Sequence, residues 1–270
     1  MEQPSRQRAL ITGASAGIGE ALAIEFARNG HDVVLVARSA NKLEALAKRL
    51  RTAHGIHAAA LCADLLEPGA PERLLQELGL RSLDIGILVN NAGILEAGPF
   101  GDMPTTRVLE LVQLNVAALT ELISGFVPRM IAAGGGRVLN VASVASFQPI
   151  AGLAVYAASK AYVLSLTEAL SEELRDKRVT FTALCPGFTD TAMVKGAQAG
   201  SKGGLNIPAI MLSSPTDVAR AGYRALMAGR VIEVPGAMNR LASSWVQYQP
   251  RWLVRGLTGR MGRQLERDGT

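Results

Sequence analysis

The sequence contains little cysteine and histidine, and this scarcity excludes several kinds of site. Of its 270 residues, two are cysteine (Cys62 and Cys185) and three are histidine. Neither set has the spacing of a disulfide framework or a metal site, so we predict no bound metal. Both cysteines fall near the ends of expected strands, where we predict buried free thiols, as in a reducing cytoplasm.

Long apolar runs and aromatic residues are also scarce. No run reaches the roughly 18 apolar residues of a transmembrane helix, and residues 1–6 lack the apolar segment of a secretory signal. We therefore expect no membrane span and a cytoplasmic protein. Aromatic residues make up only 4%, whereas Ala, Gly, Leu and Val dominate, which is typical of a parallel sheet covered by helices.

The apolar segments alternate between strand and helix patterns. Strands are expected near residues 8–12, 32–37, 57–61, 84–90, 136–143, 178–184 and 230–234. Helices are expected near 17–29, 40–53, 70–79, 105–132, 153–176 and 215–228. This alternation predicts an α/β fold, a Rossmann-like, doubly wound parallel sheet of about seven strands with helices on both faces. We assign residues 1–235 to this domain and 236–270 to a C-terminal helical extension that is not an independent domain.

A glycine-rich turn follows the first strand. Gly13, Gly17 and Gly19 come directly after the apolar run ending at Thr12, and a helical pattern begins at once. Glycines here permit a tight turn and let a pyrophosphate approach the free N–H groups of the helix N-terminus. The spacing Gly-x-x-x-Gly-x-Gly is not the commoner Gly-x-Gly-x-x-Gly, so a purely structural turn is the alternative.

The end of the second strand lacks an acidic residue. Ala37 is followed by Arg38 at the point where a carboxylate would bind the ribose 2′-hydroxyl of NAD. A guanidinium can instead hold a 2′-phosphate through paired hydrogen bonds. We therefore predict NADP(H) rather than NAD(H), with Ser15 as an additional hydroxyl donor; the alternative is a solvated arginine.

Tyr156 and Lys160 are four residues apart, and Ser143 lies thirteen residues before Tyr156. Four residues make about one helical turn, so the phenol and the ammonium share a helix face. We predict that this charge lowers the pKa of Tyr156. Lowered by roughly 2–3 units, the phenol could exchange a proton with an alcohol or ketone near neutral pH. The same pair also occurs on ordinary helix surfaces, so its spacing alone is weak evidence.

In this order, the motifs resemble the short-chain dehydrogenase/reductase family over residues 6–235. Further matches are Asp64, the Asn90-Asn91-Ala92-Gly93 segment, Asn115 and the Pro186-Gly187 turn with Thr189. The resemblance implies that Tyr156 gives the proton in carbonyl reduction and that Ser143 stabilises the developing alkoxide. It also implies that Lys160 lowers the pKa of Tyr156 and holds the nicotinamide ribose, and that Asn115 holds a water.

The resemblance implies a cofactor site at the carboxyl ends of the strands. Its predicted members are Gly13, Ser15, Ala16, Gly17, Ile18, Gly19, Arg38, Asp64, Leu65, Asn91, Ala92, Gly93, Tyr156, Lys160, Pro186, Gly187 and Thr189. Asp64 is expected to meet the adenine, although a helix N-cap after its strand is an alternative for this residue.

The segment from Thr189 to about Ser213 is where the family carries a substrate-covering loop. Its glycines would permit closure over a substrate. Apolar residues in or beside it, and others near the catalytic motifs, indicate either an apolar substrate surface or core packing. They are Met193, Leu205, Ile207, Ile210, Met211 and Leu212, with Val144, Phe147, Ile150 and Leu153.

The last part of the chain is basic. Residues 236–270 hold six arginines against two acidic residues, +4 of the chain's net +5, and both tryptophans, Trp245 and Trp252. Three interpretations are open: packing over the substrate cleft or a neighbouring subunit, contact with an anionic membrane surface, or binding of an acidic ligand tail. We expect no nucleic-acid partner, because the basic excess is confined to this tail and no aromatic-lined sheet accompanies it.

The sequence therefore predicts an NADP(H)-dependent reductase of an apolar ketone or a 3-oxoacyl substrate. The alternatives are a dehydrogenase that oxidises a secondary alcohol and a non-catalytic dinucleotide-sensing protein. The resemblance further implies a homodimer or homotetramer formed through the helices near 105–132 and 153–176.

Overall fold

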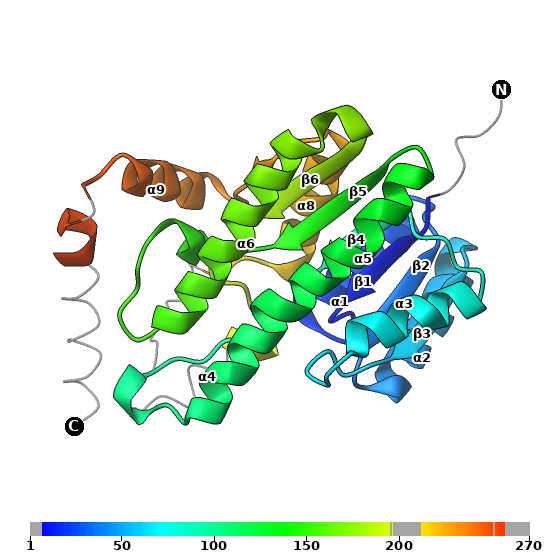
Figure 1. Cartoon of the computed structure of the whole chain (residues 1–270), viewed down its shortest axis with the longest axis horizontal. Coiled ribbons are helices and arrows are strands. Elements are labelled where there is room, and N and C mark those ends of the chain that lie inside the picture. The colour runs from blue at the N-terminus through cyan, green and yellow to red at the C-terminus, as the bar shows by residue number, and fades with distance from the viewer. Residues whose placement is uncertain (1–6, 195, 197–211, 251, 257–270) are drawn as a thin grey trace.

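The computed structural model describes residues 7–194, 196, 212–250 and 252–256, and a seven-stranded parallel sheet lies at its centre (Figure 1). The strand order is β3-β2-β1-β4-β5-β6-β7. The strands are β1 (Ala9–Thr12), β2 (Val33–Ala37), β3 (Ala58–Cys62), β4 (Ile87–Asn90), β5 (Gly136–Val141), β6 (Val179–Leu184) and β7 (Ile232–Glu233). The predicted doubly wound sheet is confirmed.

Helices cover both faces of this sheet (Figure 1). The α-helices are α1 (Gly17–Arg28), α2 (Ala40–His54), α3 (Ala70–Leu80), α4 (Thr105–Val112), α5 (Leu119–Ala132), α6 (Ala154–Glu173), α8 (Pro215–Met227) and α9 (Ala237–Gln247). Short 3₁₀ turns are η1 (Phe100–Asp102), η3 (Val144–Phe147) and η4 (Arg175–Lys177), and η2 (Gln113–Ala118) is a π-helix.

Two apolar cores form because successive side chains of a strand point to opposite faces of the sheet. Leu10 of β1 joins a core that includes buried residues of α3, α5 and α6. The next residue, Ile11, joins the opposite core with residues of α1, α2 and α8. The buried strands therefore read as continuous apolar runs, which is why their positions could be predicted closely.

The helix expected at 105–132 consists of three parts, α4, η2 and α5. The π-turn adds a residue to the helical repeat, and such insertions often occur at functional sites. Within the described residues, the run Thr105–Ala132 also has the length and hydropathy of a membrane span. The prediction of no such segment considered only unbroken apolar runs. Buried residues such as Leu122 and Phe126 pack this helix against the sheet.

The two cysteines differ in exposure. Cys185 is buried at the end of β6, as predicted. The prediction that Cys62 is buried was wrong, because it is exposed at the end of β3, an edge strand with no neighbour on its outer side. Its thiol donates to the backbone oxygen of Arg38 at 3.2 Å.

The carboxyl ends of all seven strands meet at one edge of the sheet. The order of strands reverses between β1 and β4, and ligands of doubly wound folds bind in the crevice at such a switch point. The predicted site residues follow the strands at this edge: the glycine turn after β1, Arg38 after β2, Asp64 and Leu65 after β3, Asn91 to Gly93 after β4, Ser143 after β5, and Pro186 to Thr189 after β6.

Candidate active site

Helix α6 brings the predicted catalytic tyrosine and lysine to this edge. Lys160 is buried, and its Nζ donates to the backbone oxygen of Val141 at 2.8 Å. The same nitrogen lies 5.8 Å from the centroid of the Tyr156 ring. The predicted placement of the phenol and the ammonium on one face of the helix is confirmed, and Lys160 reaches the end of β5.

Ser143 begins the turn η3 directly after β5. Its extended backbone and its side-chain oxygen cap the turn, because the oxygen accepts the N–H of Ala145 at 3.1 Å. The Ser143 side chain also forms a hydrogen bond with Tyr156. Two hydroxyl groups are thus adjacent next to a buried ammonium, an arrangement that can donate two hydrogen bonds to one substrate oxygen.

The predicted lowering of the Tyr156 pKa was wrong for this structure. Burial of the hydroxyl disfavours the phenolate and raises the pKa of Tyr156, while the hydrogen bond with Ser143 opposes this rise. Burial also acts on the neighbouring Lys160. There it disfavours the charged ammonium and lowers the pKa to about 8. Burial is therefore the largest cause of both shifts, and residue spacing alone does not indicate burial.

Asn115 lies in the π-turn and connects it to the segment after β4. Its Oδ1 accepts the backbone N–H of Ile94, and its Nδ2 donates to the backbone oxygen of Ile94, both at 2.9 Å. The Nδ2 group also donates to Ser159 Oγ at 3.2 Å, and Ser159 donates to the backbone oxygen of Tyr156. The Asn115 side chain is occupied by protein groups, and its water-holding role stays a prediction.

Gly93 lies between Asn115 and Lys160. A Cβ atom at this position would be 3.0 Å from Asn115 Oδ1 and 3.5 Å from Lys160 Nζ. A side chain there would press against the Asn115 amide and would be in van der Waals contact with Lys160 Nζ. The absence of a side chain at Gly93 thus permits the segment after β4 to pack closely against Asn115.

Asn91 fastens the glycine turn to the switch point. Its Nδ2 donates to the backbone oxygen of Thr12 at 2.9 Å, and its backbone N–H donates to Thr12 Oγ1 at 3.0 Å. The N–H of Ala92 reaches the same hydroxyl at 3.0 Å. A Cβ on Gly13 would lie 2.7 Å from Asn91 Nδ2, and the backbone there has a φ of +66°. The turn is therefore held in a conformation that favours glycine.

A buried chain of polar side chains supports this edge from within the sheet. Asn90 Nδ2 donates to Asn140 Oδ1, and Asn140 Nδ2 donates to Thr167 Oγ1, both at 2.9 Å. Thr167 in turn donates to the backbone oxygen of Val163. Asn140 and Thr167 were missed by the sequence analysis, because only the folded sheet brings β4, β5 and α6 together.

The residues of the cofactor half fit a bound dinucleotide. Helix α1 begins at Gly17 without a side-chain cap, which leaves its first N–H groups for an anion such as a pyrophosphate. Arg38 is exposed after β2, and the Thr189 hydroxyl donates to the backbone oxygen of Gly187 at 3.1 Å. Asp64 is not a helix N-cap, because it accepts the N–H of Leu66 in a turn and α3 begins only at Ala70.

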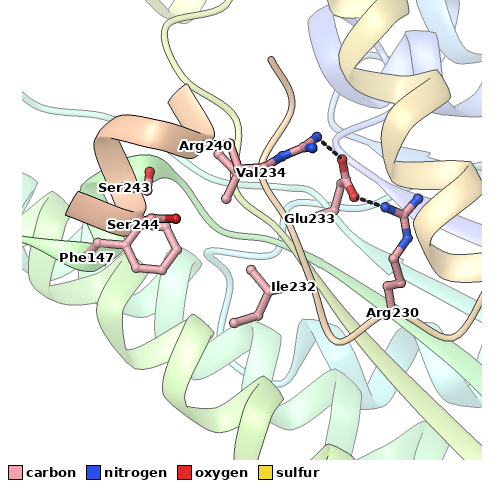
Figure 2. Close-up of a pocket in the computed structure, with 8 residues that line it drawn as sticks. All are labelled: Phe147, Arg230, Ile232, Glu233, Val234, Arg240, Ser243 and Ser244. Carbon is pink, nitrogen blue, oxygen red and sulfur yellow. Dashed lines mark ion pairs between the residues drawn. The ribbon is translucent and has the colours of Figure 1, made fainter. Parts of the chain in front are cut away.

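The C-terminal helix α9 packs against the same edge. It contacts η3, and Asn239 lies so close to Gly187 that a Cβ there would meet its Nδ2 at 2.6 Å. A pocket of about 300 Å³ is lined by residues of α9, β7 and η3 and of the segments beside β7 (Figure 2). Its lining residues are Phe147, Arg230, Ile232, Glu233, Val234, Arg240, Ser243 and Ser244. Helix α9 thus packs beside the turn that follows Ser143, while the three interpretations of the extension stay predictions.

Part of the predicted site falls outside the described residues. These are residues 195 and 197–211 of the predicted substrate-covering loop, with Leu205, Ile207, Ile210 and Met211 among them, and Arg251, Arg260, Arg263 and Arg267 of the extension. The residues Met193 and Leu212, which flank that loop, are described, and Met193 is 43% exposed. Leu153, by contrast, is buried, so it serves the core rather than an open substrate surface.

The fold and the site geometry are those of a Rossmann-like protein whose switch-point edge fits a dinucleotide. The family model for short chain dehydrogenases matches residues 7–202. The chain belongs to the short-chain dehydrogenase/reductase family, whose members act on alcohols and ketones.

Individual relatives agree with this assignment. The chain is 36% identical over 229 residues to 1-deoxy-11-beta-hydroxypentalenate dehydrogenase of Streptomyces exfoliatus, which covers 82% of this chain and 80% of that protein. A short-chain dehydrogenase from Sphingobium yanoikuyae, solved with NADPH, shares 35% identity at a TM-score of 0.80, with 88% and 90% of the two chains covered. The bulky-bulky ketone specific alcohol dehydrogenase from Comamonas testosteroni shares 29% at 0.74, with 91% and 95% covered.

Proposed function

We propose that this protein is an NADP(H)-dependent reductase that converts an apolar ketone of moderate size, or a 3-oxoacyl compound, to the secondary alcohol. The observation that carries the proposal is the pair of adjacent hydroxyls, Ser143 and Tyr156, beside the buried Lys160 at the switch-point edge. A carbonyl being reduced needs donors on its oxygen, and this pair supplies two.

The chain's own groups carry the proton half of this reaction. The nicotinamide, when bound, supplies the hydride. Tyr156 is the proton donor, and its raised pKa keeps the phenol protonated at neutral pH, the form that can give a proton to a developing alkoxide. Ser143 donates a hydrogen bond to the same oxygen. Lys160 would hold the ribose hydroxyls of the bound nicotinamide nucleotide and would contribute positive charge near the alkoxide.

The preference for NADP(H) rests on Arg38. This exposed guanidinium follows β2, where an NAD-specific protein would carry a carboxylate. Its planar fork suits the 2′-phosphate. The NADPH bound by the Sphingobium yanoikuyae relative supports the same cofactor for this chain.

The substrate class rests on the relatives and on apolar residues near the site. One relative is named for a hydroxypentalenate and another for bulky ketones, which supports a bulky, apolar carbonyl compound. A dehydrogenase running towards the ketone uses the same residues, and the ratio of cofactor forms would set its direction. A sensing protein without turnover would not need the complete set Asn115, Ser143, Tyr156 and Lys160.

The proposal is tested by measuring the turnover of the wild type and of two tyrosine variants. NADPH oxidation is followed by absorbance with a panel of ketones, aldehydes and 3-oxoacyl thioesters, and NADH is run in parallel. Tyr156→Phe should lose roughly 10²–10⁴-fold in kcat. Tyr162→Phe, on the same helix but 38% exposed, should keep wild-type turnover. Retained turnover in Tyr156→Phe would overturn the mechanism, and binding of NADPH without turnover of any compound would favour the sensing role.

We also propose a cytoplasmic homodimer or homotetramer. The helices expected to pair carry exposed apolar side chains, Leu109 at 61% and Val112 at 39% on α4 and Tyr162 at 38% on α6. Light scattering after size-exclusion chromatography measures the number of subunits, and a monomer at micromolar concentration would contradict this proposal.

A further inference from the structure

Helix α9 carries its apolar and polar side chains in the reverse of the usual arrangement. The residues that face the protein are Asn239, Ser243 and Val246, at helical spacing, and Ser243 is 6% exposed. The opposite face, here named the outer face of α9, is large and apolar. Its residues are Met238, Leu241, Trp245 and Tyr248, which are 79%, 69%, 52% and 87% exposed. A surface helix of a globular protein ordinarily buries its apolar face.

This orientation is fixed by several contacts. The carboxylate of Glu233, which is buried on β7, pairs with Arg230 at 2.7 Å and with Arg240 of α9 at 3.6 Å (Figure 2). Asn239 donates to the backbone oxygen of Pro235 at 3.0 Å and packs on Gly187. These contacts hold the polar face of α9 towards the body of the protein, so the outer face points to solvent. Trp252, after the helix, adds a further side chain that is 68% exposed.

The charge of the surrounding segment identifies the kind of surface that would cover this face. Besides Arg240, which pairs with Glu233, residues 236–265 contain four arginines and no acidic residue. Pairing of this face with its equivalent on a second copy would bring two segments of like charge together, which opposes association. An anionic lipid surface complements both properties, because Trp, Tyr and Leu enter the interface while arginines meet the headgroups.

We propose that the outer face of α9, with Trp252, is a contact surface for the headgroup region of an anionic lipid bilayer. The same helix packs on η3, which follows Ser143, and on the Pro186-Gly187 turn. Contact would therefore place the predicted reaction site next to the phase in which an apolar ketone dissolves. This consequence rests on the proposed reductase function, whereas the binding itself does not.

Binding to vesicles tests the surface directly. The full chain is sedimented with vesicles of phosphatidylcholine alone and with vesicles that also contain phosphatidylglycerol. Because both tryptophans lie in the extension, the tryptophan emission of the chain should also shift to shorter wavelength on binding. We expect binding to be roughly tenfold or more tighter with phosphatidylglycerol, and to weaken as salt is raised.

Matched variants separate the outer face of α9 from exposed apolar residues elsewhere. Trp245→Ser should weaken binding, and the combined Met238→Ser, Leu241→Ser, Trp245→Ser and Tyr248→Ser variant should abolish it. Leu80→Ser, at a residue 86% exposed on α3, should bind as the wild type does. All variants should keep wild-type turnover of a water-soluble ketone and wild-type unfolding temperatures, because none touches the site or a core.

Several outcomes would overturn the proposal. They are absence of binding to both vesicle types, equal binding by the combined variant, and equal loss with Leu80→Ser. Loss of self-association in the combined variant without any vesicle binding would assign the outer face of α9 to a second copy instead. If turnover of the soluble ketone persists while vesicle binding fails, only this proposal falls. If turnover is absent but vesicle binding holds, the proposed function falls and the surface stands.

Discussion

The predicted catalytic corner, which holds Asn115 and Lys160, and the predicted cofactor-selecting rim, which holds Arg38, are built in different ways. In the catalytic corner, Asn115 and Lys160 are buried, and protein groups hold each of them at fixed distances. At the rim, Arg38 is exposed, and within the described part of the chain its side chain takes part in no ion pair. Under the proposed function, turnover would depend on groups whose burial costs stability, whereas the choice of cofactor would depend on a side chain that could change without disturbing the fold.

Replacing Lys160 should give the largest effect and sharpen this contrast. Lys160→Met should reduce kcat/KM roughly 10²–10³-fold, because charge near the developing alkoxide and a contact to the cofactor are both lost.

The stability of the wild type relative to this variant should also depend on pH in a defined direction. Burial lowers the pKa of Lys160 from 10.5 to about 8, so between these values the unfolded chain keeps a proton that the folded chain has released. The free energy of unfolding of the wild type should therefore rise with pH relative to the variant.

Urea unfolding of both proteins at pH values from about 7.5 to 10.5 measures this difference. A difference that stays constant over the window would show that the folded and unfolded pKa values of Lys160 are the same. Such a result would mean that the Lys160 ammonium is hydrated in the folded protein. Lys160 would then no longer differ from the exposed Arg38 in this respect.

Asn115→Ala should be destabilising, in keeping with a structural role at the catalytic corner. The change leaves the backbone N–H and oxygen of Ile94 without their partner, so the free energy of unfolding should fall by about 2–3 kcal/mol. Val112→Ala, one turn earlier at a residue 39% exposed, should change it by no more than about 0.5 kcal/mol. Equal effects in the two variants would mean that the π-turn does not depend on this amide.

Arg38→Ala should have the smallest effect on the protein and a selective effect on the cofactor. We expect the KM for NADPH to rise roughly tenfold or more, because a charge-assisted pair is lost. The KM for NADH and the unfolding temperature should hardly change. Arg28→Ala, an exposed arginine at the end of α1, is the control. An equal rise in the KM for NADPH and for NADH in Arg38→Ala would show that Arg38 does not bind the 2′-phosphate.

The order of strands and helices could be predicted because it depends on local patterns. Buried strands are continuous apolar runs, and the glycine turn, Arg38 and Ser143 each follow such a run directly. Residues that act through the folded sheet gave no such signal. The partnership of Asn140 with Asn90 and Thr167 joins segments 50 and 27 residues apart.

Environment was the other property that the sequence did not reveal. The spacing of Tyr156 and Lys160 predicts their proximity but not the burial that raises one pKa and lowers the other. Cys62 was placed wrongly because its exposure depends on which strand forms the sheet edge. The reversed arrangement of α9 likewise needs the contacts of Glu233 and Asn239, which only the fold brings together.

The amide chain inside the sheet has a consequence for how the strands choose their partners. Asn90 and Asn140 occupy facing positions in the ladder between β4 and β5. A slip of one residue would turn the Asn140 amide to the other face of the sheet, among apolar side chains, and separate it from both Asn90 and Thr167. Misaligned pairings are thereby penalised during folding. The amides specify a single alignment of the two strands that carry Asn91 and Ser143, and so fix the separation of those groups before any ligand binds.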